Sequence, residues 1–230
     1  MLLAGAFLLN KFLKNTLNIS AEFDIINVSE SKRSDKMSKK TSRNTKGRII
    51  VAAWKLFYEQ GYDDTTIEEI IEESGTSKGS FYHYFAGKDA LLSSLSYMFD
   101  EKYEELTELL DENASAFDKL LFLNKELFVM VENSISLDLL AKLLSSQLVT
   151  KGEKHLLDHN RTYYKLLRKI ISAGQQKGEF TQDKSVNEMV RLYALSERAL
   201  LYDWCLSEGS YSLSRYSEEL LPVFLSGLKK

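Results

Sequence analysis

The side chains best suited to chemistry in this chain gather in the segment 76–84, TSKGSFYHY, where hydroxyl groups, a lysine and polar aromatic rings stand beside small residues. Hydroxyls and backbone N–H groups at the start of a helix can hold a phosphate, and Lys78 can reach a phosphate or a base edge. Gly79 and Ser80 are small enough to let a helix approach base edges closely. The alternative is an ordinary solvated helix face. We expect DNA contacts from Thr76, Ser77, Lys78, Gly79, Ser80, Tyr82, His83 and Tyr84.

The residues before this segment predict the helix and the turn that position it. Thr65 or Thr66 can cap a helix, and the acidic residues that follow favour its positive end. Isoleucines at helical spacing give that helix one apolar face. Gly75 can adopt the left-handed turn that ends a helix, after which Thr76 or Ser77 can cap the next one. This order predicts a helix-turn-helix, whose second helix enters the major groove of DNA, and Thr66 joins the expected contacts.

Basic residues lie on both sides of the predicted helix-turn-helix. A run of lysines and arginines over residues 32–48 contains a single acidic residue. Such a run is either a disordered, solvated lead-in or a basic arm near phosphates, and we expect the second for Arg43, Lys46 and Arg48. Lys88 stands at the start of the following helix, where the helix dipole disfavours a cation. A phosphate partner would explain its position.

These motifs form a pattern that is more specific than a generic helix-turn-helix. The order of a small residue, Phe-Tyr, an aromatic residue, Phe, Lys and Leu is hard to obtain by chance. The pattern comprises Gly47, Arg48, Ile49, Ile50, Ala52, Ala53, Leu56, Phe57, Gly61, Tyr62, Thr65, Thr66, Ile67, Ile70, Gly75, Thr76, Ser77, Lys78, Gly79, Ser80, Phe81, Tyr82, Tyr84, Phe85, Lys88, Asp89, Ala90 and Leu91. Over about residues 44–95 the chain therefore resembles the N-terminal domain of the TetR family of bacterial transcriptional regulators.

The resemblance implies a small three-helix head, completed by a fourth helix, and a helical body that binds a ligand and dimerises. It assigns a phosphate contact to Lys88. A weaker similarity over residues 193–213 implies that the last two helices pair with their copies in a four-helix dimer interface, where we expect Leu201 and Leu225. Ala199 departs from this pattern, because many relatives have a glycine there.

The composition favours an almost all-helical globular protein. The chain has 230 residues, of which 44% are hydrophobic and 27% charged, ordinary values for a globular protein. Because Pro222 is the single proline, little interrupts the helical patterns. The net charge of −3 confines nucleic-acid binding to a local patch. The lone cysteine, Cys205, excludes an intrachain disulfide and favours a reducing, cytoplasmic compartment.

We expect three regions along the chain. Residues 1–43 form an unstructured or upstream extension with a basic tail, residues 44–92 the helix-turn-helix domain, and residues 93–230 the effector-binding and dimerisation domain. Met37 opens an ordinary start for a TetR-like chain, and the alternative for the preceding residues is an amphipathic helix on a membrane surface over 2–17; we expect no membrane contact. In the body, helices are expected over 88–112, unbroken, and over 117–131, 137–148, 154–176, 186–206 and 214–228.

Polar residues interrupt several apolar stripes of these body helices. Asn124, Asn160 and Glu197 are examples, and a buried polar group needs a partner. That partner is another side chain, a second subunit or a ligand, and ordinary core packing remains the alternative. An apolar cavity with few polar anchors is the usual form of a ligand site. We expect a small apolar or aromatic effector to be bound by Tyr103, Asn124, Phe128, Asn160, Tyr163 and Tyr193.

No motif predicts catalysis. His155 and His159 have the spacing of a zinc-protease pair, but Leu156 stands where such enzymes have their catalytic glutamate. We expect no metal, no cofactor and no enzyme activity. The sequence predicts an all-α, homodimeric transcriptional repressor that a small-molecule effector releases from double-stranded operator DNA. The alternatives are a constitutive DNA-binding regulator and a helical enzyme with a vestigial head.

Overall fold

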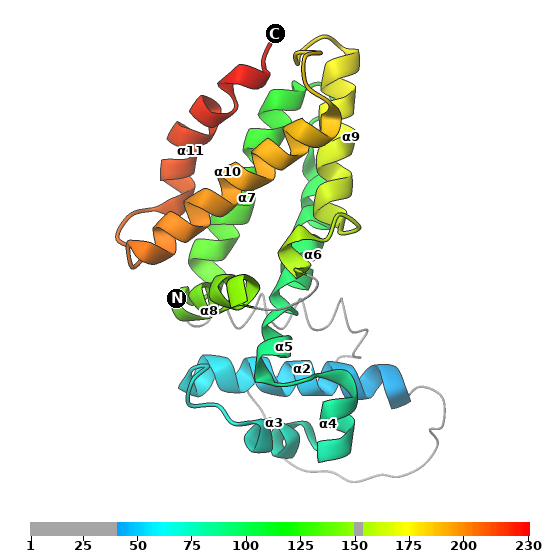
Figure 1. Ribbon diagram of the computed structural model, residues 1–230, viewed down its shortest axis with the longest axis vertical. Coiled ribbons are helices and arrows are strands. Elements are labelled where there is room, and N and C mark those ends of the chain that lie inside the picture. Colours follow the sequence, from blue (N-terminus) through cyan, green and yellow to red (C-terminus); the bar gives the residue numbers. More distant parts are fainter. Residues whose placement is uncertain (1–40, 150–153) are drawn as a thin grey trace. The chain divides into compact units, whose positions relative to one another are not determined.

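The computed structural model describes residues 41–149 and 154–230, without the side chains of residues 41–44 and of Tyr97. The described residues divide into a first unit, which ends at Ser94, and a second unit, which begins at Leu95. Every named element in them is a helix, so the predicted all-α fold is confirmed (Figure 1). The expected start at Met37, the basic residues up to Lys40 and the surface helix over 2–17 lie outside the described residues. The domain boundary at residues 92 and 93 stays a prediction.

The first unit consists of α2 (Thr41–Gln60), α3 (Ile67–Ser74), α4 (Lys78–Tyr84) and α5 (Lys88–Leu92). Its core is aromatic and aliphatic: Trp54, Ile70 and Phe81 are completely buried. The edge of the Trp54 ring faces Phe57 with the ring centroids 5.7 Å apart. A buried indole N–H needs an acceptor, and Trp54 Nε1 donates to Ser94 Oγ at 2.7 Å. This bond ties the last residue of the unit to the middle of α2.

The caps of α3 and α4 form as the sequence predicts. Thr66 is the N-cap of α3, and its side chain and that of Glu69 bond each other's backbone N–H groups in a capping box. Gly75 ends α3 in the left-handed conformation, with φ of 58°. Ser77 caps α4 by accepting from the backbone N–H of Ser80 at 3.1 Å. Since both ends of the turn are fixed, the direction of α4 relative to α3 is fixed too.

The helix predicted over 88–112 is interrupted, so that prediction is wrong. α5 ends at Leu92 and α6 (Leu95–Leu109) starts after a turn at Ser93 and Ser94. Both serines donate their hydroxyls to backbone carbonyls of α5, Ser93 to Ala90 at 2.6 Å and Ser94 to Leu91 at 2.5 Å. Serine hydroxyls compete in this way with the helical pattern, and Ser94 also serves Trp54. The apolar stripe is continuous while the helix is not.

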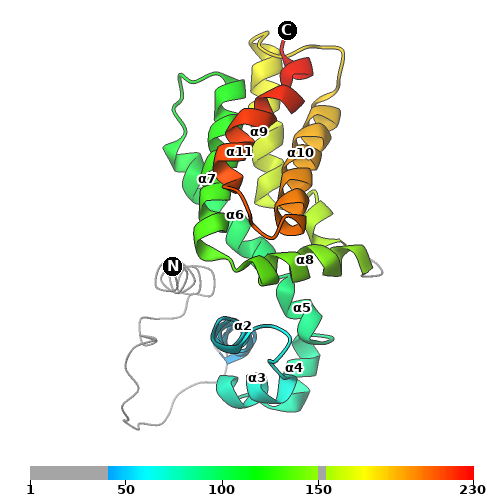
Figure 2. The same ribbon diagram turned by 90° about the vertical axis from the view of Figure 1, so that its left-hand side faces the viewer.

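Over residues 95–149 and 154–230 the second unit is a bundle of six α-helices (Figure 2). They are α6, α7 (Ala116–Ser134), α8 (Leu137–Val149), α9 (Thr162–Gln176), α10 (Val186–Leu206) and α11 (Leu213–Phe224), with short 3₁₀ turns η1 (His155–Leu157) and η2 (Ser226–Leu228). α7 packs against α11, α9 and α6, whereas α10 packs against α9, α11 and α8. None of the helices in the described residues is long and apolar enough to cross a membrane.

Two further helix predictions need correction. The helix predicted over 154–176 begins only at Thr162, after η1 and a turn. The side chain of Asp158 accepts from the backbone N–H of Asn160 at 2.9 Å, a local bond that competes with a helix. The helix predicted over 214–228 ends at Phe224 and is followed by η2.

Candidate DNA-reading face and effector pocket

One face of α4 is exposed and carries most of the predicted DNA contacts. Phe81 is completely buried and Phe85 nearly so, which places the opposite side of the helix in solvent. That side consists of the N-cap Ser77 together with Lys78, Gly79, Tyr82 and His83, all exposed. We call it the α4 face. A Cβ added to Gly79 would meet only the Ser77 hydroxyl, 3.9 Å away, so the backbone is open to an approaching partner.

The other hydroxyl residues predicted to contact DNA already make bonds within the first unit. Thr76 shares a hydrogen bond of 2.8 Å with Ser74, and Ser80 shares one of 3.0 Å with Ser77. Tyr84 is half-buried. The Thr66 hydroxyl is part of the capping box of α3. The structure therefore brings Thr76, Ser80 and Tyr84 to the edge of the α4 face and gives Thr66 a structural task.

Two of the four predicted phosphate-binding cations at the flanks, Arg48 and Lys88, donate hydrogen bonds to backbone carbonyls. Arg48 donates from a terminal guanidinium nitrogen to the carbonyl of Gly75 at 2.7 Å. Lys88 donates to the carbonyls of Tyr62, Asp63 and Thr65. Lys78 differs from both, because its side chain is 68% exposed and its described partner is the equally exposed Glu68 at 3.3 Å.

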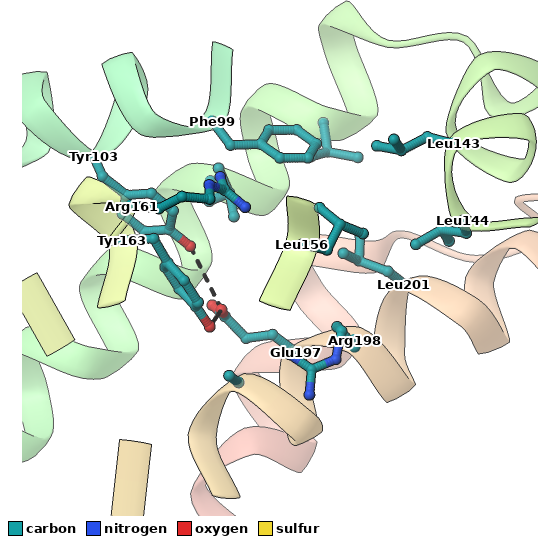
Figure 3. A pocket seen from close by; sticks show the side chains of 13 residues that line it. Phe99, Tyr103, Leu143, Leu144, Leu156, Arg161, Tyr163, Glu197, Arg198 and Leu201 are labelled. Carbon is teal, nitrogen blue, oxygen red and sulfur yellow. Dashed lines mark hydrogen bonds between the residues drawn. The ribbon is translucent and has the colours of Figure 1, made fainter. Parts of the chain in front are cut away.

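A pocket opens among the helices of the second unit (Figure 3). The space available in it amounts to about 50 Å³, well below the roughly 300–1,000 Å³ of the usual small-molecule site, so a ligand of that size would have to widen it. Most of its wall is apolar, with a few polar and charged groups. The lining consists of Phe99, Tyr103, Leu127, Val131, Leu143, Leu144, Leu156, Arg161, Tyr163, Ala194, Glu197, Arg198 and Leu201.

Glu197 forms the polar end of this pocket. Its carboxylate accepts from Tyr163 at 2.6 Å, from Asn124 at 3.0 Å and from Tyr103 at 3.5 Å, and Figure 3 shows both tyrosine hydroxyls directed at it. We call these four residues the Glu197 cluster. Burial is the main reason why the pKa of Glu197 is raised, although its hydrogen bonds lower it in part. No basic side chain in the described residues forms an ion pair with Glu197.

The structure thus brings together three of the six predicted effector contacts, Tyr103, Asn124 and Tyr163, although Asn124 stands behind Glu197 and not in the lining. Tyr193 is buried and donates to the carbonyl of Leu120 at 2.9 Å. Phe128 is completely buried in the core, and Asn160 is exposed in the turn before α9. None of these last three lines the pocket.

The sequence interpretation missed the arginines of the pocket. Arg161 binds both carboxylate oxygens of Asp100, at 2.9 and 3.1 Å, and the carbonyl of Ser96. Arg198 makes one long bond, to the hydroxyl of Tyr164 at 3.4 Å. Arg198 could have been predicted near the pocket, because it directly follows Glu197, which interrupts an apolar stripe. Arg161 precedes its helix, so helical spacing could not place it.

Two family models match the chain in consecutive parts. Residues 49–95 match the model described as bacterial regulatory proteins of the tetR family, and residues 98–227 match the C-terminal region of YsiA-like proteins. The chain belongs to the TetR family. The predicted resemblance is confirmed, and the protein is a DNA-binding transcriptional regulator with a helix-turn-helix.

Curated relatives extend over most of this TetR-family chain. The Fatty acid metabolism regulator protein of Bacillus subtilis (strain 168) is 25% identical over 185 residues, which are 79% of this chain and 94% of the relative. The HTH-type transcriptional repressor KstR2 of Mycobacterium tuberculosis (strain ATCC 25618 / H37Rv) is 22% identical over 187 residues, 80% of this chain and 93% of the relative. Both relatives are regulator proteins, and KstR2 is a transcriptional repressor.

Solved structures show the same fold. FadR of Thermus thermophilus, a repressor crystallised with lauroyl-CoA, matches with a TM-score of 0.64 at 24% identity, covering 78% of this chain and 93% of that one. FadR of Bacillus subtilis with stearoyl-CoA matches with a TM-score of 0.59 at 24% identity, covering 79% of this chain and 98% of that one. A helix-turn-helix unit followed by a helical unit is therefore the shared architecture.

Proposed function

We propose that this regulator represses transcription by binding an operator through the α4 face and that an effector bound in the pocket releases it. The observation that carries the proposal is an apolar pocket with the buried Glu197 at its polar end, in a unit other than the one that holds α4. The repressors among its relatives support the sign of the regulation.

The proposed contacts with DNA are graded by exposure. Lys78 and the backbone at Gly79 stand at the centre of the α4 face, and Ser77, Tyr82 and His83 surround them. Thr76, Ser80 and Tyr84 lie at its edge, where hydroxyls can contact phosphates once the helix is in the groove. Protection mapping with the full chain on DNA flanking its own gene would identify the operator. A protein that binds no sequence more tightly than random duplex would contradict the proposal.

The lining of the pocket favours an effector with an apolar part and a polar group. Phe99, Leu143 and Leu144 offer apolar surface, whereas the carboxyl group of Glu197 and the guanidinium group of Arg198 offer polar contacts. FadR proteins of similar fold hold lauroyl-CoA and stearoyl-CoA, so acyl-CoA thioesters are the first class of effector that we propose to test. Simple aromatic compounds, which the tyrosines would accept, are the second.

Ligand-dependent melting would test the effector. A compound that binds only the folded protein, present at about a hundred times its Kd, stabilises it by about 2.7 kcal/mol. We expect a higher melting temperature and release of operator DNA with acyl-CoAs of one chain-length range, and neither with free CoA. A shift with free CoA alone would place the binding outside the apolar pocket. No shift with any acyl-CoA or aromatic compound would favour a constitutive regulator.

We further propose that α10 and α11 pair with their copies in a homodimer. Leu195 and Leu206 on α10 and Val223 on α11 are 54, 81 and 64% exposed, and pairing with a second copy would remove this apolar surface from water. Leu201 and Leu225, which the sequence analysis placed in the interface, are buried within the protomer. Changes at those two positions would test the fold and not the dimer.

Charged substitutions at the exposed positions test the dimer directly. We expect Leu206→Asp and Val223→Asp to weaken self-association strongly in sedimentation experiments, because a charge would be buried against an apolar surface. Leu157→Asp is the matched control, since Leu157 is 47% exposed on η1. A dimer unaffected by both changes would place the interface elsewhere.

A further inference from the structure

The guanidinium group of Arg161 is fixed at the wall of the pocket by two groups of α6. Its Nε and Nη2 donate to the carboxylate oxygens of Asp100 at 2.9 and 3.1 Å, and Nη2 also donates to the carbonyl of Ser96 at 2.9 Å. The side chains of Arg161 and Asp100 are only 10 and 15% exposed. Because a planar guanidinium group held by three bonds cannot turn freely, its direction is set before any ligand arrives.

The second terminal nitrogen of this arginine, Nη1, remains available. An arginine has five N–H donors, and the bonds to α6 use those of Nε and Nη2. Within residues 41–149 and 154–230, Nη1 forms no hydrogen bond, and protein atoms do not enclose it completely. Arg161 lines the pocket, and Figure 3 shows its guanidinium group among the other lining side chains. A ligand that widens the pocket can therefore meet a donor to which the described residues offer no acceptor.

Other donors in the lining are less suited to this role. The hydroxyls of Tyr103 and Tyr163 have one hydrogen each, and both donate it to Glu197. Arg198 is held by one long hydrogen bond, of 3.4 Å to the hydroxyl of Tyr164, so its direction is less well defined. Arg161 combines a fixed direction with an unused donor, which is the arrangement expected of a residue that recognises one particular acceptor.

The charges around Arg161 favour a neutral acceptor over an anion. Asp100 already compensates the positive charge of the guanidinium group through both of its oxygens, so an anion at Nη1 would lie near that carboxylate without a cation of its own. Glu197 adds a second acidic group to the surroundings of the pocket. Burying a charge without a partner costs far more than burying a hydrogen-bonded neutral group. A carbonyl oxygen accepts a hydrogen bond and brings no charge.

We propose that Arg161 binds a neutral carbonyl oxygen of the effector through Nη1, and that it thereby selects thioesters, esters or ketones over carboxylates. Asp100 and Ser96 are its positioning residues, because they fix the guanidinium group and compensate its charge. The apolar part of the effector then packs on lining residues such as Phe99 and Leu143. The inference rests on the proposed effector function of the pocket and names the chemical group that the pocket recognises.

Two ligands that differ only in the carbonyl group test the role of Arg161. An acyl-CoA thioester carries this carbonyl, whereas the S-alkyl-CoA thioether of the same chain length has a methylene group in its place. We expect the wild-type protein to bind the thioester at least about tenfold more tightly in calorimetric titration, the effect of one hydrogen bond from a charged donor. Equal affinities would overturn the proposal, and this measurement needs no variant.

Arg161→Lys should remove the preference, because lysine keeps a cation for Asp100 but lacks the forked guanidinium group. Arg198→Met is the matched control, since Arg198 lines the same pocket. It should change both affinities by a common factor and so preserve their ratio. A preference that survives in Arg161→Lys, or one that is lost in Arg198→Met, would overturn the assignment to Arg161. Thermal melting of each variant without ligand shows that it is folded.

The preference for a neutral group is tested with a fatty acid and its methyl ester. At about pH 8 the acid is ionised, and we expect the wild-type protein to bind the ester more tightly than the carboxylate of the same chain length. A carboxylate that binds as tightly as the ester would overturn the selection of neutral groups. If neither thioester, thioether nor ester binds, the effector function has failed as well. If thioester and thioether bind equally, only the role of Arg161 has failed.

Discussion

The α4 face and the Glu197 cluster are both polar sites, but they are assembled in different ways. The α4 face comes from one short stretch, in which a cap, a glycine and one buried phenylalanine decide which side chains reach solvent. In the Glu197 cluster the partners lie between 34 and 94 positions from Glu197 along the chain, on α6, α7 and α9. A locally assembled site can be interpreted from its own residues. For a site assembled from distant helices, the sequence indicates candidate members but not which of them are partners.

The two sites also differ in whether their side chains are hydrated. Side chains on the α4 face are hydrated before DNA arrives, so changes there should alter binding with little effect on folding. Glu197 and its partners are buried, and removing one partner leaves others without a hydrogen bond. We therefore expect substitutions on the α4 face to change DNA binding without changing stability. Substitutions in the pocket should change binding and stability together.

The largest effect on stability is expected from Glu197→Ala. The change leaves the Tyr163 hydroxyl and the Asn124 amide without their acceptor and opens a cavity, for which we expect a loss of about 3 kcal/mol in the free energy of unfolding. Operator affinity measured well below the melting temperature should stay unchanged. Urea unfolding would measure the loss, and one below about 1 kcal/mol would show that the buried bonds contribute little.

Glu197→Gln is the matched variant and carries a pH prediction. Burial raises the folded-state pKa of Glu197 above its ordinary value of 4.5. A group whose pKa is higher in the folded state makes its full contribution to stability below the unfolded-state pKa. This contribution is lost as pH rises through the folded-state pKa. We expect wild-type stability to fall relative to that of the Gln variant as pH rises above the ordinary glutamate pKa of 4.5. A difference independent of pH would contradict the burial of an ionisable group.

Much of the first unit follows from its sequence because short-range rules decide it. The cap at Thr66, the left-handed Gly75 and the buried Phe81 each depend on neighbours a few positions away. The break at Ser94 does not, because its hydroxyl is fixed by Trp54, 40 positions earlier. The same holds for Lys88, whose carbonyl partners lie in a turn formed before α3.

In the pocket, the sequence identified polar residues on apolar stripes but not their partners. Glu197 and Asn124 were both expected to need a hydrogen bond, and the structure pairs them with each other at 3.0 Å. Asn160 followed the same stripe rule, yet it lies in a turn, since the bond from its backbone to Asp158 ends the helical spacing there. Periodicity is informative only where the helix it assumes exists.

A smaller but specific effect is expected at Gly79, where binding should change without folding. Gly79→Ala adds a methyl group at an ordinary van der Waals distance of 3.9 Å from the Ser77 hydroxyl and should stabilise α4 by up to about 1 kcal/mol. Gly79→Leu should fold equally well but hold α4 away from base edges, with operator affinity reduced about a hundredfold, or about 2.7 kcal/mol. Fluorescence titration with operator duplex would measure both. Normal affinity of the Leu variant would show that α4 does not enter the groove at this position.

The smallest effect is expected at Thr66, next to the α4 face. It tests whether a substitution there can lower the stability of α3 without changing operator affinity. The Thr66 hydroxyl donates to Glu69 at 2.8 Å and accepts from the backbone N–H of Glu69 at 3.2 Å. Loss of such a cap costs about 1 kcal/mol, so Thr66→Ala should increase hydrogen exchange in α3 by about fivefold, whereas Thr66→Ser should not. If the hydroxyl serves only the cap, operator affinity in the cold stays within a factor of about two. A tenfold loss in the Ala variant, restored by Ser, would instead make Thr66 a DNA contact and extend the reading surface beyond α4.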